Sequence, residues 1–285
     1  MKRDGIIPTT LRLATCAALI VAAWPGTAAA TEPCDDFGEC KVLIEINSTD
    51  GDIGFHFLMD GDDLVEGRLS DPDGNTLFKD KANGALAEQF MTETFLESAE
   101  PLCWEDPEAD PDDLIVTLEE FLDRWPDGTY EVAGRDGENE RAEGETDPTY
   151  QLPASPQHLD FIAGVISWTP GNDLGNCATA AELDDLVADG ILPIHPENVV
   201  VDHWEVVLEP DTEDGDPVGE DKFSLRLPGD VALTQVTVPA DYLAALPDDT
   251  PVKIEVGAIG GEDNATFTEE DGFCVNEVEG CEDEE

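Results

Sequence analysis

Apolar and polar residues alternate along much of this chain, and the alternation predicts strands that bury one face. The clearest case is the stretch in which Val252, Ile254 and Val256 alternate with Lys253 and Glu255. A period of two places all three apolar side chains on one side of an extended segment. Because similar stretches recur from the forties to the 270s, the sequence favours an all-β fold.

Turn-forming residues separate these stretches. Asp-Gly and Pro-Asp-Gly sequences, such as those at Asp60–Asp63 and Asp71–Asn75, are typical of tight connections between antiparallel strands. A helical period, with apolar residues three and four apart, predicts short helices at 113–124 and 180–188. The expected strands are 41–47, 54–59, 64–70, 76–80, 92–99 (or a helix there), a strand from Tyr130, one around Ile166–Trp168, 199–209, 223–227, 233–238, 252–259 and 264–270.

One short pattern occurs twice. Residues 118–135 and 238–259 both read as a leucine-bearing approach, a corner with Pro-Asp followed by threonine, and then an alternating strand. Proline and aspartate impose such corners. The sequence therefore predicts one supersecondary unit used in each half of the chain.

The second half resembles a fibronectin type III domain over roughly 153–268. That family carries a tryptophan on its second strand, matched here by Trp168, and a Leu-x-Pro-Gly-Thr-x-Tyr corner before its sixth strand, approximated by Leu246 to Val252. The chain departs from the family at Val252, where the corner tyrosine belongs, and in an insertion at 172–196. The resemblance implies a β-sandwich that serves as a spacer or binding platform.

We therefore expect two tandem antiparallel β-sandwich domains with short helical insertions. The first domain, 31–152, matches no family known to us, but its strands also suggest a sandwich, with Tyr130 near the equivalent corner. The stretch Leu152-Pro153-Ala154-Ser155-Pro156 predicts a stiff connector. The second domain is expected at 153–270, and an acidic tail with two cysteines at 271–285.

The N-terminus has the features of an export signal, predicted for residues 1–30. Lys2 and Arg3 precede an apolar run, Leu13–Trp24, and Ala28–Ala30 offers a cleavage site. That run is too short to span a bilayer, and no later stretch is long enough. We expect a secreted, periplasmic or cell-envelope protein without a transmembrane segment.

Cysteines support this location, because an even number in an exported chain indicates disulfides. Two close pairs suggest small local loops, which leaves a third pair between the halves, although six cysteines allow about 15 connectivities. No spacing fits a zinc site. Of the seven cysteines, Cys16 lies in the predicted signal, and the other six are Cys34, Cys40, Cys103, Cys177, Cys274 and Cys281.

The chain is strongly acidic, with 68 Asp and Glu, 13 Lys and Arg and a formal net charge of −55. Nucleic-acid binding needs a basic footprint, so the charge argues against a nucleic-acid partner. A solvated acidic surface explains the charge most simply, and cation capture is the sharper alternative.

Calcium is the possible cofactor of that alternative, because it takes oxygen ligands from carboxylates and carbonyls at turns. The candidate ligands lie in three aspartate-rich turns of the first domain, none of which matches an EF-hand. The same residues are also what ordinary hairpins use. The candidates are Asp50, Asp52, Asp60, Asp62, Asp71 and Asp73.

No catalytic motif occurs in the sequence. The GxSxG, HExxH, P-loop and GxGxxG patterns are all missing. His56 and His203 are expected on outward strand faces as surface residues, and Trp104 and Trp125 are the candidates for sugar stacking. We predict an exported, non-catalytic binding or structural protein with an unknown protein or glycan partner. Calcium binding is one alternative, and a secreted hydrolase with a carboxylate pair is a second.

Overall fold

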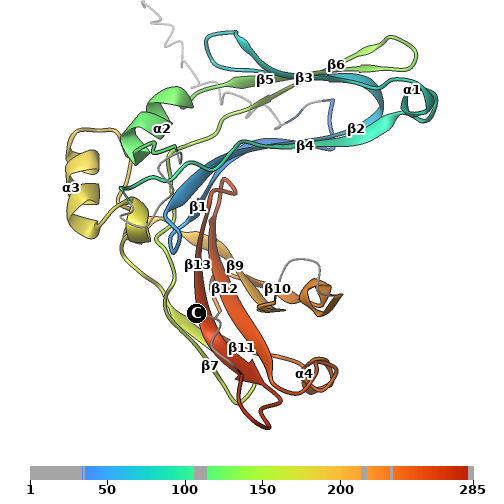
Figure 1. The fold of residues 1–285 in the computed structure, drawn as a ribbon. Helices are drawn as coiled ribbons and strands as arrows, with labels where there is room; N and C mark the ends of the chain where they lie inside the picture. Colours follow the sequence, from blue (N-terminus) through green and yellow to red (C-terminus); the bar gives the residue numbers. More distant parts are fainter. Residues whose placement is uncertain (1–33, 35, 106–113, 213–216, 232–233, 282–285) are drawn as a thin grey trace, which may run out of the picture. The chain divides into compact units, whose positions relative to one another are not determined.

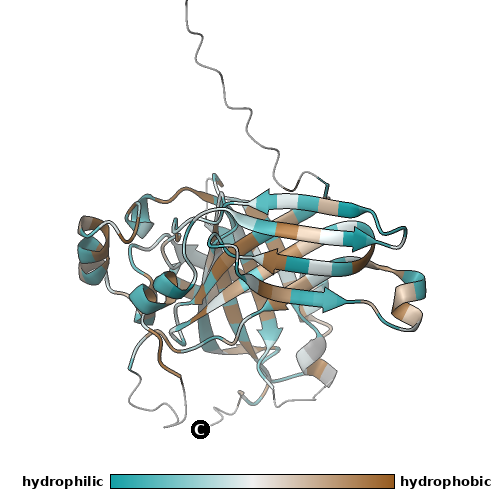
Figure 2. Cartoon of the chain, turned by 90° about the horizontal axis from the view of Figure 1, so that it is seen from above, coloured by the Kyte–Doolittle hydropathy of each residue, from teal (hydrophilic) through white to brown (hydrophobic). Residues whose placement is uncertain are grey.

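The computed structural model describes residues 34, 36–105, 114–212, 217–231 and 234–281. The chain from Pro33 to Glu285 forms one compact unit. Strands dominate it and the helices are short, which confirms the predicted all-β class (Figure 1). Apolar and polar positions alternate along the strands (Figure 2). The predicted signal, 1–30, lies outside the described residues.

The first half contains six strands, and a single long strand organises them. β2 pairs with β1, β3, β4 and β5, and β5 pairs in turn with β6. Its elements are β1 (Glu39–Asn47), β2 (Asp52–Ser70), β3 (Thr76–Lys81), α1 (Ala85–Gln89), β4 (Met91–Glu97), α2 (Leu118–Arg124), β5 (Tyr130–Asp136) and β6 (Arg141–Thr146).

The predicted turn at Asp60–Asp63 is wrong, because β2 runs through it without a break. The pairing of β2 with β4 shifts register between Asp60 and Leu64, and Asp63 has a φ of 54°. An aspartate in the left-handed region and a shifted register are the signs of a β-bulge, which bends a strand without ending it. The turn-forming residues are therefore used to curve β2 (Figure 1).

The second half contains two facing groups of strands. One is a separate sheet with the order β11-β8-β7, and the other has the order β10-β9-β12-β13. The strands are β7 (Gln157–Ile162), β8 (Val165–Thr169), β9 (Val201–Pro210), β10 (Phe223–Pro228), β11 (Gln235–Thr237), β12 (Thr250–Gly260) and β13 (Ala265–Val275). The helices are η1 (Gly175–Cys177), α3 (Ala180–Ala188), η2 (Pro196–Asn198), η3 (Pro217–Glu220) and α4 (Ala240–Leu243).

Side chains from both strand groups fill the core of the second half. Trp168 on β8 and Trp204 on β9 are buried, and their rings lie 5.7 Å apart. Val206, Ile254 and Val256 pack in the same cluster. The alternation that predicted β12 therefore reflects burial between two layers of strands.

A parallel pairing joins the two halves. Glu45–Asn47 of β1 lie beside Ala265–Phe267 of β13, so that strands of both halves belong to one ten-stranded sheet in the described chain. Nothing in the sequence indicates this pairing, because its two strands are more than 200 residues apart.

The predicted connector is packed against β13. Thr266 Oγ1 donates a hydrogen bond to the carbonyl of Pro153 at 2.7 Å, and Thr268 Oγ1 donates one to the carbonyl of Pro156 at 2.8 Å. Leu152 is fully buried. These contacts hold the extended segment along β13.

The insertion of the second half packs against the core of the first. Leu174, Leu183 and Leu192 belong to the same buried cluster as Phe55 and Phe121. The Cys103–Cys177 disulfide lies at this contact. The other two disulfides, Cys34–Cys40 and Cys274–Cys281, close local loops, so all three pairings expected from the spacing are present.

The two similar corners are closed by different side chains. In the first, the Tyr130 hydroxyl donates to the carbonyl of Pro126 at 3.0 Å, which is the bond of a tyrosine corner. In the second, where Val252 is buried and apolar, Asn276 donates from Nδ2 to the carbonyls of Leu243 at 2.7 Å and Leu246 at 2.8 Å. An amide from the next strand end thus replaces the missing tyrosine.

Replacing Asn276 by alanine is expected to lower the free energy of unfolding by about 2 kcal/mol. The change removes both hydrogen bonds and forces alanine to adopt the φ of 55° at this position. Asn276→Gly is the control, because it loses the same bonds without backbone strain. Urea unfolding should rank the wild type above glycine and glycine above alanine. Equal stability of all three would contradict this role of Asn276.

Candidate functional site

Three side chains with metal-ligating atoms meet on one face of the large sheet. Glu45 lies on β1, His56 on β2, and Glu100 follows β4. Glu45 is directly opposite Gly54, which is two residues before His56 on the same face. The pleat therefore places the Glu45 carboxylate diagonally beside the imidazole.

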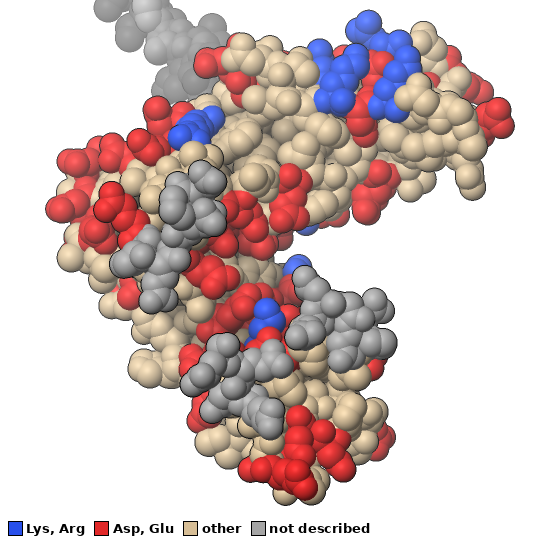
Figure 3. Space-filling view, viewed as in Figure 1, with Lys and Arg blue, Asp and Glu red and all other residues tan. Residues whose placement is uncertain are grey.

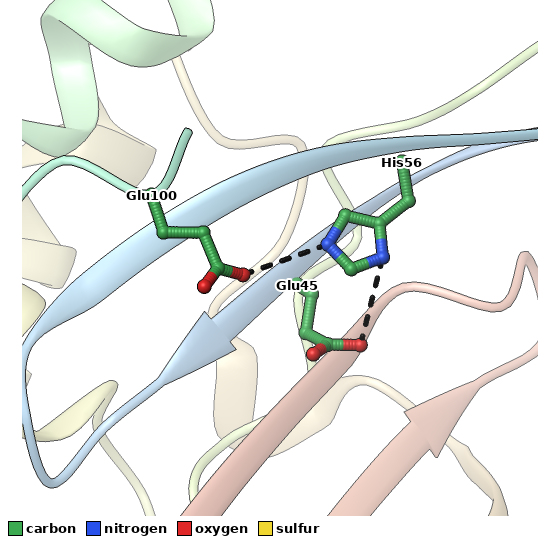
Figure 4. Close-up of side chains that lie close together, drawn as sticks. All are labelled: Glu45, His56 and Glu100. Atoms are coloured by element: carbon green, nitrogen blue, oxygen red, sulfur yellow. Dashed lines mark ion pairs between the residues drawn. The ribbon is translucent and has the colours of Figure 1, made fainter. Parts of the chain in front are cut away.

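The three groups point toward one another (Figure 4). His56 Nε2 is 3.6 Å from Glu100 Oε1, and His56 Nδ1 is 4.0 Å from Glu45 Oε2. One ligand atom from each residue falls within a set whose members lie within 4.8 Å of one another. Among the described residues, no other group of three His, Cys, Asp or Glu side chains meets this criterion.

Gly54 provides the room for this arrangement. A Cβ atom at that position would lie 2.9 Å from both Glu100 Oε1 and His56 Nε2. The absence of a side chain lets the imidazole and the carboxylate approach each other above the strand. The glycine is thus part of the site although it offers no ligand atom.

His56 is buried and one of its nitrogens lacks a hydrogen bond. Its side chain is 9% exposed, and Nε2 has no hydrogen-bond partner among the described residues. A buried polar atom without a partner costs about 1–3 kcal/mol. An unpartnered buried nitrogen that faces the Glu100 carboxylate, with Glu45 at the other ring nitrogen, is a candidate metal ligand.

The prediction that His56 is a surface histidine is wrong. The face of β2 that carries it is covered by neighbouring side chains, among them Phe95 of β4, whose ring meets the imidazole edge-on at 5.8 Å. His203 on β9 is exposed, as predicted.

Burial also affects Glu45. Loss of solvent raises the pKa of its carboxyl, the nearby His56 opposes the rise, and repulsion from Glu100 and Glu97 adds to it. A cation bound beside His56 would reduce the repulsion between Glu45 and Glu100, because it would lie close to both carboxylates.

Further half-buried acids lie beyond Glu45 on the ten-stranded sheet. We call Glu45, Glu209, Glu255 and Glu269 the acidic face. On β12, burial and then repulsion by Glu269 of β13 raise the pKa of Glu255 to about 8. Lys253 forms ion pairs with two of these acids: its Nζ is 3.2 Å from Glu269 Oε2 and 3.3 Å from Glu209 Oε1. The pairing of β1 with β13 therefore unites acids of both halves on one surface.

The six aspartates proposed as calcium ligands lie at three separate places along β2. Asp50 and Asp52 flank the turn between β1 and β2, and Asp60 and Asp62 lie within the strand. Asp71 and Asp73 are in the turn to β3 at the other end, where Asp71 accepts hydrogen bonds from Asn75. The structure does not bring the three groups together.

Only the first of these groups lies near the His56 site. Burial raises the pKa of Asp52 to about 7, and repulsion from Glu100 and Asp50 contributes. Asp52 is therefore electrostatically linked to the carboxylate that approaches His56 Nε2. The structure gives Asp50 and Asp52 a place at the edge of the site.

The two tryptophans proposed for sugar stacking are engaged within the protein. Trp125 stacks on Phe55 with ring centroids 4.0 Å apart. Trp104 packs on the first core, and its Nε1 donates to the carbonyl of Asp50 at 3.1 Å. Both side chains are half-buried, and sugar stacking on either ring stays a prediction.

Sequence reasoning missed the His56 site because its ligands are far apart along the chain. Glu45 precedes His56 by 11 residues and Glu100 follows it by 44. No spacing motif joins them, and acids are so frequent that neither glutamate stands out. The glycine two residues before the histidine was the one local signal, since glycine within a strand often marks a close approach.

Comparisons with known proteins identify no family. No protein-family pattern and no curated protein matches the chain. Among solved structures, a tetra-tandem repeat from the extending region of a large adhesion protein has 12% identity and a TM-score of 0.25, and the match covers 83% of this chain and 49% of that one.

Two further solved structures show similarly low values. The BSP domain of a biofilm-associated protein has 10% identity and a TM-score of 0.20 over 86% of this chain and 30% of that one. A bacterial ice-binding adhesin has 11% identity and a TM-score of 0.20 over 83% and 64%. The chain thus spans less than two thirds of each, and the similarity is too low to assign a function.

Within the part of the chain that the structure describes, no helix has both the length and the apolar character needed to cross a bilayer.

Proposed function

We propose that this chain is an exported, non-catalytic β-sandwich protein that acts in binding or as a structural module outside the cytoplasm, and that Glu45, His56 and Glu100 bind a divalent transition metal. The observation that carries the metal site is the buried His56 Nε2, which has no hydrogen bond among the described residues and lies 3.6 Å from Glu100 Oε1. The predicted signal and the three disulfides support the extracellular or envelope location.

The ligand set favours zinc or a similar ion over calcium. Imidazole nitrogen suits zinc, whereas calcium takes six to eight oxygens. A zinc ion bound at about 2.0–2.1 Å to two tetrahedral ligands holds them roughly 3.4 Å apart. The 3.6 Å between His56 Nε2 and Glu100 Oε1 is close to that value. Three protein ligands leave one position for water or for a partner's side chain.

Isothermal titration of the purified protein with zinc, manganese and calcium tests the proposal. We expect one zinc ion per chain and weaker calcium binding. His56→Gln should weaken zinc binding by at least about tenfold, because it removes the imidazole ligand. His203→Gln removes an exposed histidine from β9 and should have no effect.

A second variant separates the ligands from the space they need. Gly54→Ala retains all three ligands but places a methyl group where Glu100 and His56 now meet. It should reduce zinc affinity while far-ultraviolet circular dichroism stays unchanged. Equal zinc binding by wild type, His56→Gln and Gly54→Ala would overturn the metal site. Tighter binding of calcium than zinc, lost on changing Asp50 and Asp52, would instead favour the calcium alternative.

We also infer that the second half is a fibronectin type III-like sandwich. Three strands, β7, β8 and β11, face the four strands β10, β9, β12 and β13. Trp168 lies on the second strand of this half, and the Pro247 corner precedes the sixth. Both features match the positions on which the sequence resemblance rests.

Glu255 and Glu269 favour one second candidate, a hydrolase with a carboxylate pair. The pKa of Glu255, raised to about 8, suits a general acid of the kind that such hydrolysis uses. Incubation with neutral and acidic polysaccharides, followed by a reducing-sugar assay, tests it. Activity that is lost in Glu255→Gln would replace the non-catalytic proposal.

A further inference from the structure

Basic residues are scarce in this chain, yet five of the 13 share one sheet face. They lie on β2, β3, β5 and β6. Figure 3 shows them gathered over these strands, whereas most charged residues elsewhere in that view are acidic. The basic face consists of Arg68, Lys79, Lys81, Arg135 and Arg141.

The strand registers arrange the basic face in two rows across the strands. In one row, Lys79 of β3 is opposite Arg68 of β2. In the other, Arg135 of β5 is opposite Arg141 of β6. Neighbouring strands are about 4.8 Å apart, so charges in a row repeat at roughly this spacing.

These pairings oppose stability. Like charges directly across a sheet repel, and both Arg68–Lys79 and Arg135–Arg141 are such pairs. Glu66 relieves part of the repulsion, with Oε1 2.8 Å from Lys79 Nζ and 3.5 Å from Arg135 Nη2. Among the described residues, no ion pair involves the other member of each pair, Arg68 or Arg141, and these two free guanidinium groups favour an anionic partner.

The face is hollowed where the rows meet. A cavity of about 240 Å³ is lined by Arg68, Lys79, Arg135 and Arg141 together with Glu66 and Glu143. Three of the four basic groups are guanidinium groups, which bind a carboxylate through two parallel hydrogen bonds. The volume fits small anionic groups, not a large apolar ligand.

We propose that this basic face binds a polysaccharide whose sugars carry carboxylates. Such a polymer carries a carboxylate on each sugar, and each carboxylate can accept two parallel hydrogen bonds from one guanidinium group. A second copy of this chain would also be acidic, but it would bring a net charge of −55 toward an equal charge.

The proposal rests on the proposed role in binding, but not on the metal site. Its test is binding of the full mature chain to polygalacturonate, measured by biolayer interferometry with EDTA present. EDTA removes metal-dependent contacts, so a failure here and a failure of the zinc titration can be told apart. Dextran is the neutral control.

We expect polygalacturonate to bind at 0.15 M salt, where the Debye length is about 8 Å. Binding should be lost near 1 M salt, and dextran should not bind. Arg68→Gln/Arg141→Gln should weaken binding at least about tenfold, which corresponds to 1.4 kcal/mol. Lys222→Gln/Arg226→Gln makes the same charge change at β10 and should stay within about twofold of the wild type.

Three results would overturn the proposal. The first is no binding of polygalacturonate by the wild type at any salt concentration. The second is equal weakening by the basic-face variant and the β10 control. The third is self-association, seen by analytical ultracentrifugation without polysaccharide and lost in Arg68→Gln/Arg141→Gln, which would identify a second copy as the occupant.

Discussion

Replacing Cys103 and Cys177 together by alanine is expected to lower the free energy of unfolding by about 4 kcal/mol. The disulfide spans 74 residues, so it removes many conformations from the unfolded chain. In the folded protein it holds the insertion against the turn between β1 and β2, where the backbone N–H of Asn176 donates to the carbonyl of Ser48 at 3.1 Å.

The Cys274–Cys281 pair provides a matched comparison. It spans 7 residues, and its loss should cost only about 2 kcal/mol by the same chain-entropy argument. Guanidinium unfolding of both double-alanine variants measures the difference. If both variants lost the same free energy of unfolding, or if the short loop lost more, the length of the closed loop would not determine how much each disulfide stabilises the protein.

The free energy of unfolding is expected to fall as the pH rises from 5 to 8. Burial and repulsion by Glu269 raise the pKa of Glu255 to about 8, and burial raises that of Asp52 to about 7. In the unfolded chain both groups lose their protons near pH 4. The folded state thus binds more protons between these values, and stability declines with pH in that window.

Glu255 alone should account for roughly 3 kcal/mol of the decline, allowing for its partial contact with solvent. Glu255→Gln mimics the protonated carboxyl, so it should be more stable than the wild type at pH 8 and should flatten the profile. Glu131→Gln, an exposed site on β5, makes the same charge change elsewhere. Urea unfolding in EDTA at several pH values measures the free energy of unfolding of the wild type and of both variants. A flat wild-type profile, or equal flattening by both variants, would contradict the prediction.

The features that depend on neighbours in the sequence could be predicted. The helix at Ala180–Ala188 has the expected bounds, because Thr179 and Glu182 form a capping box at its start. Strand β12 and its corner follow from alternation and from Pro247. Trp168 and Trp204 are buried as their register required.

The features that depend on contacts between distant segments could not be predicted from the sequence. The β1–β13 pairing joins two edges with no shared signal, and it carries the acidic face from one half to the other. His56 looked like a surface residue because its alternation is regular, while the groups that bury it come from β1, from β4 and from beyond β4. Asp60–Asp63 looked like a turn because aspartate and glycine serve bulges as well as hairpins.

Zinc-edge anomalous diffraction from crystals grown with zinc tests the central claim most directly. The account predicts a strong anomalous peak about 2.0–2.1 Å from His56 Nε2, with carboxylate oxygens of Glu45 and Glu100 at similar distances. Zinc bound only at other sites, with His56 Nε2 hydrogen-bonded to water or protein, would contradict it.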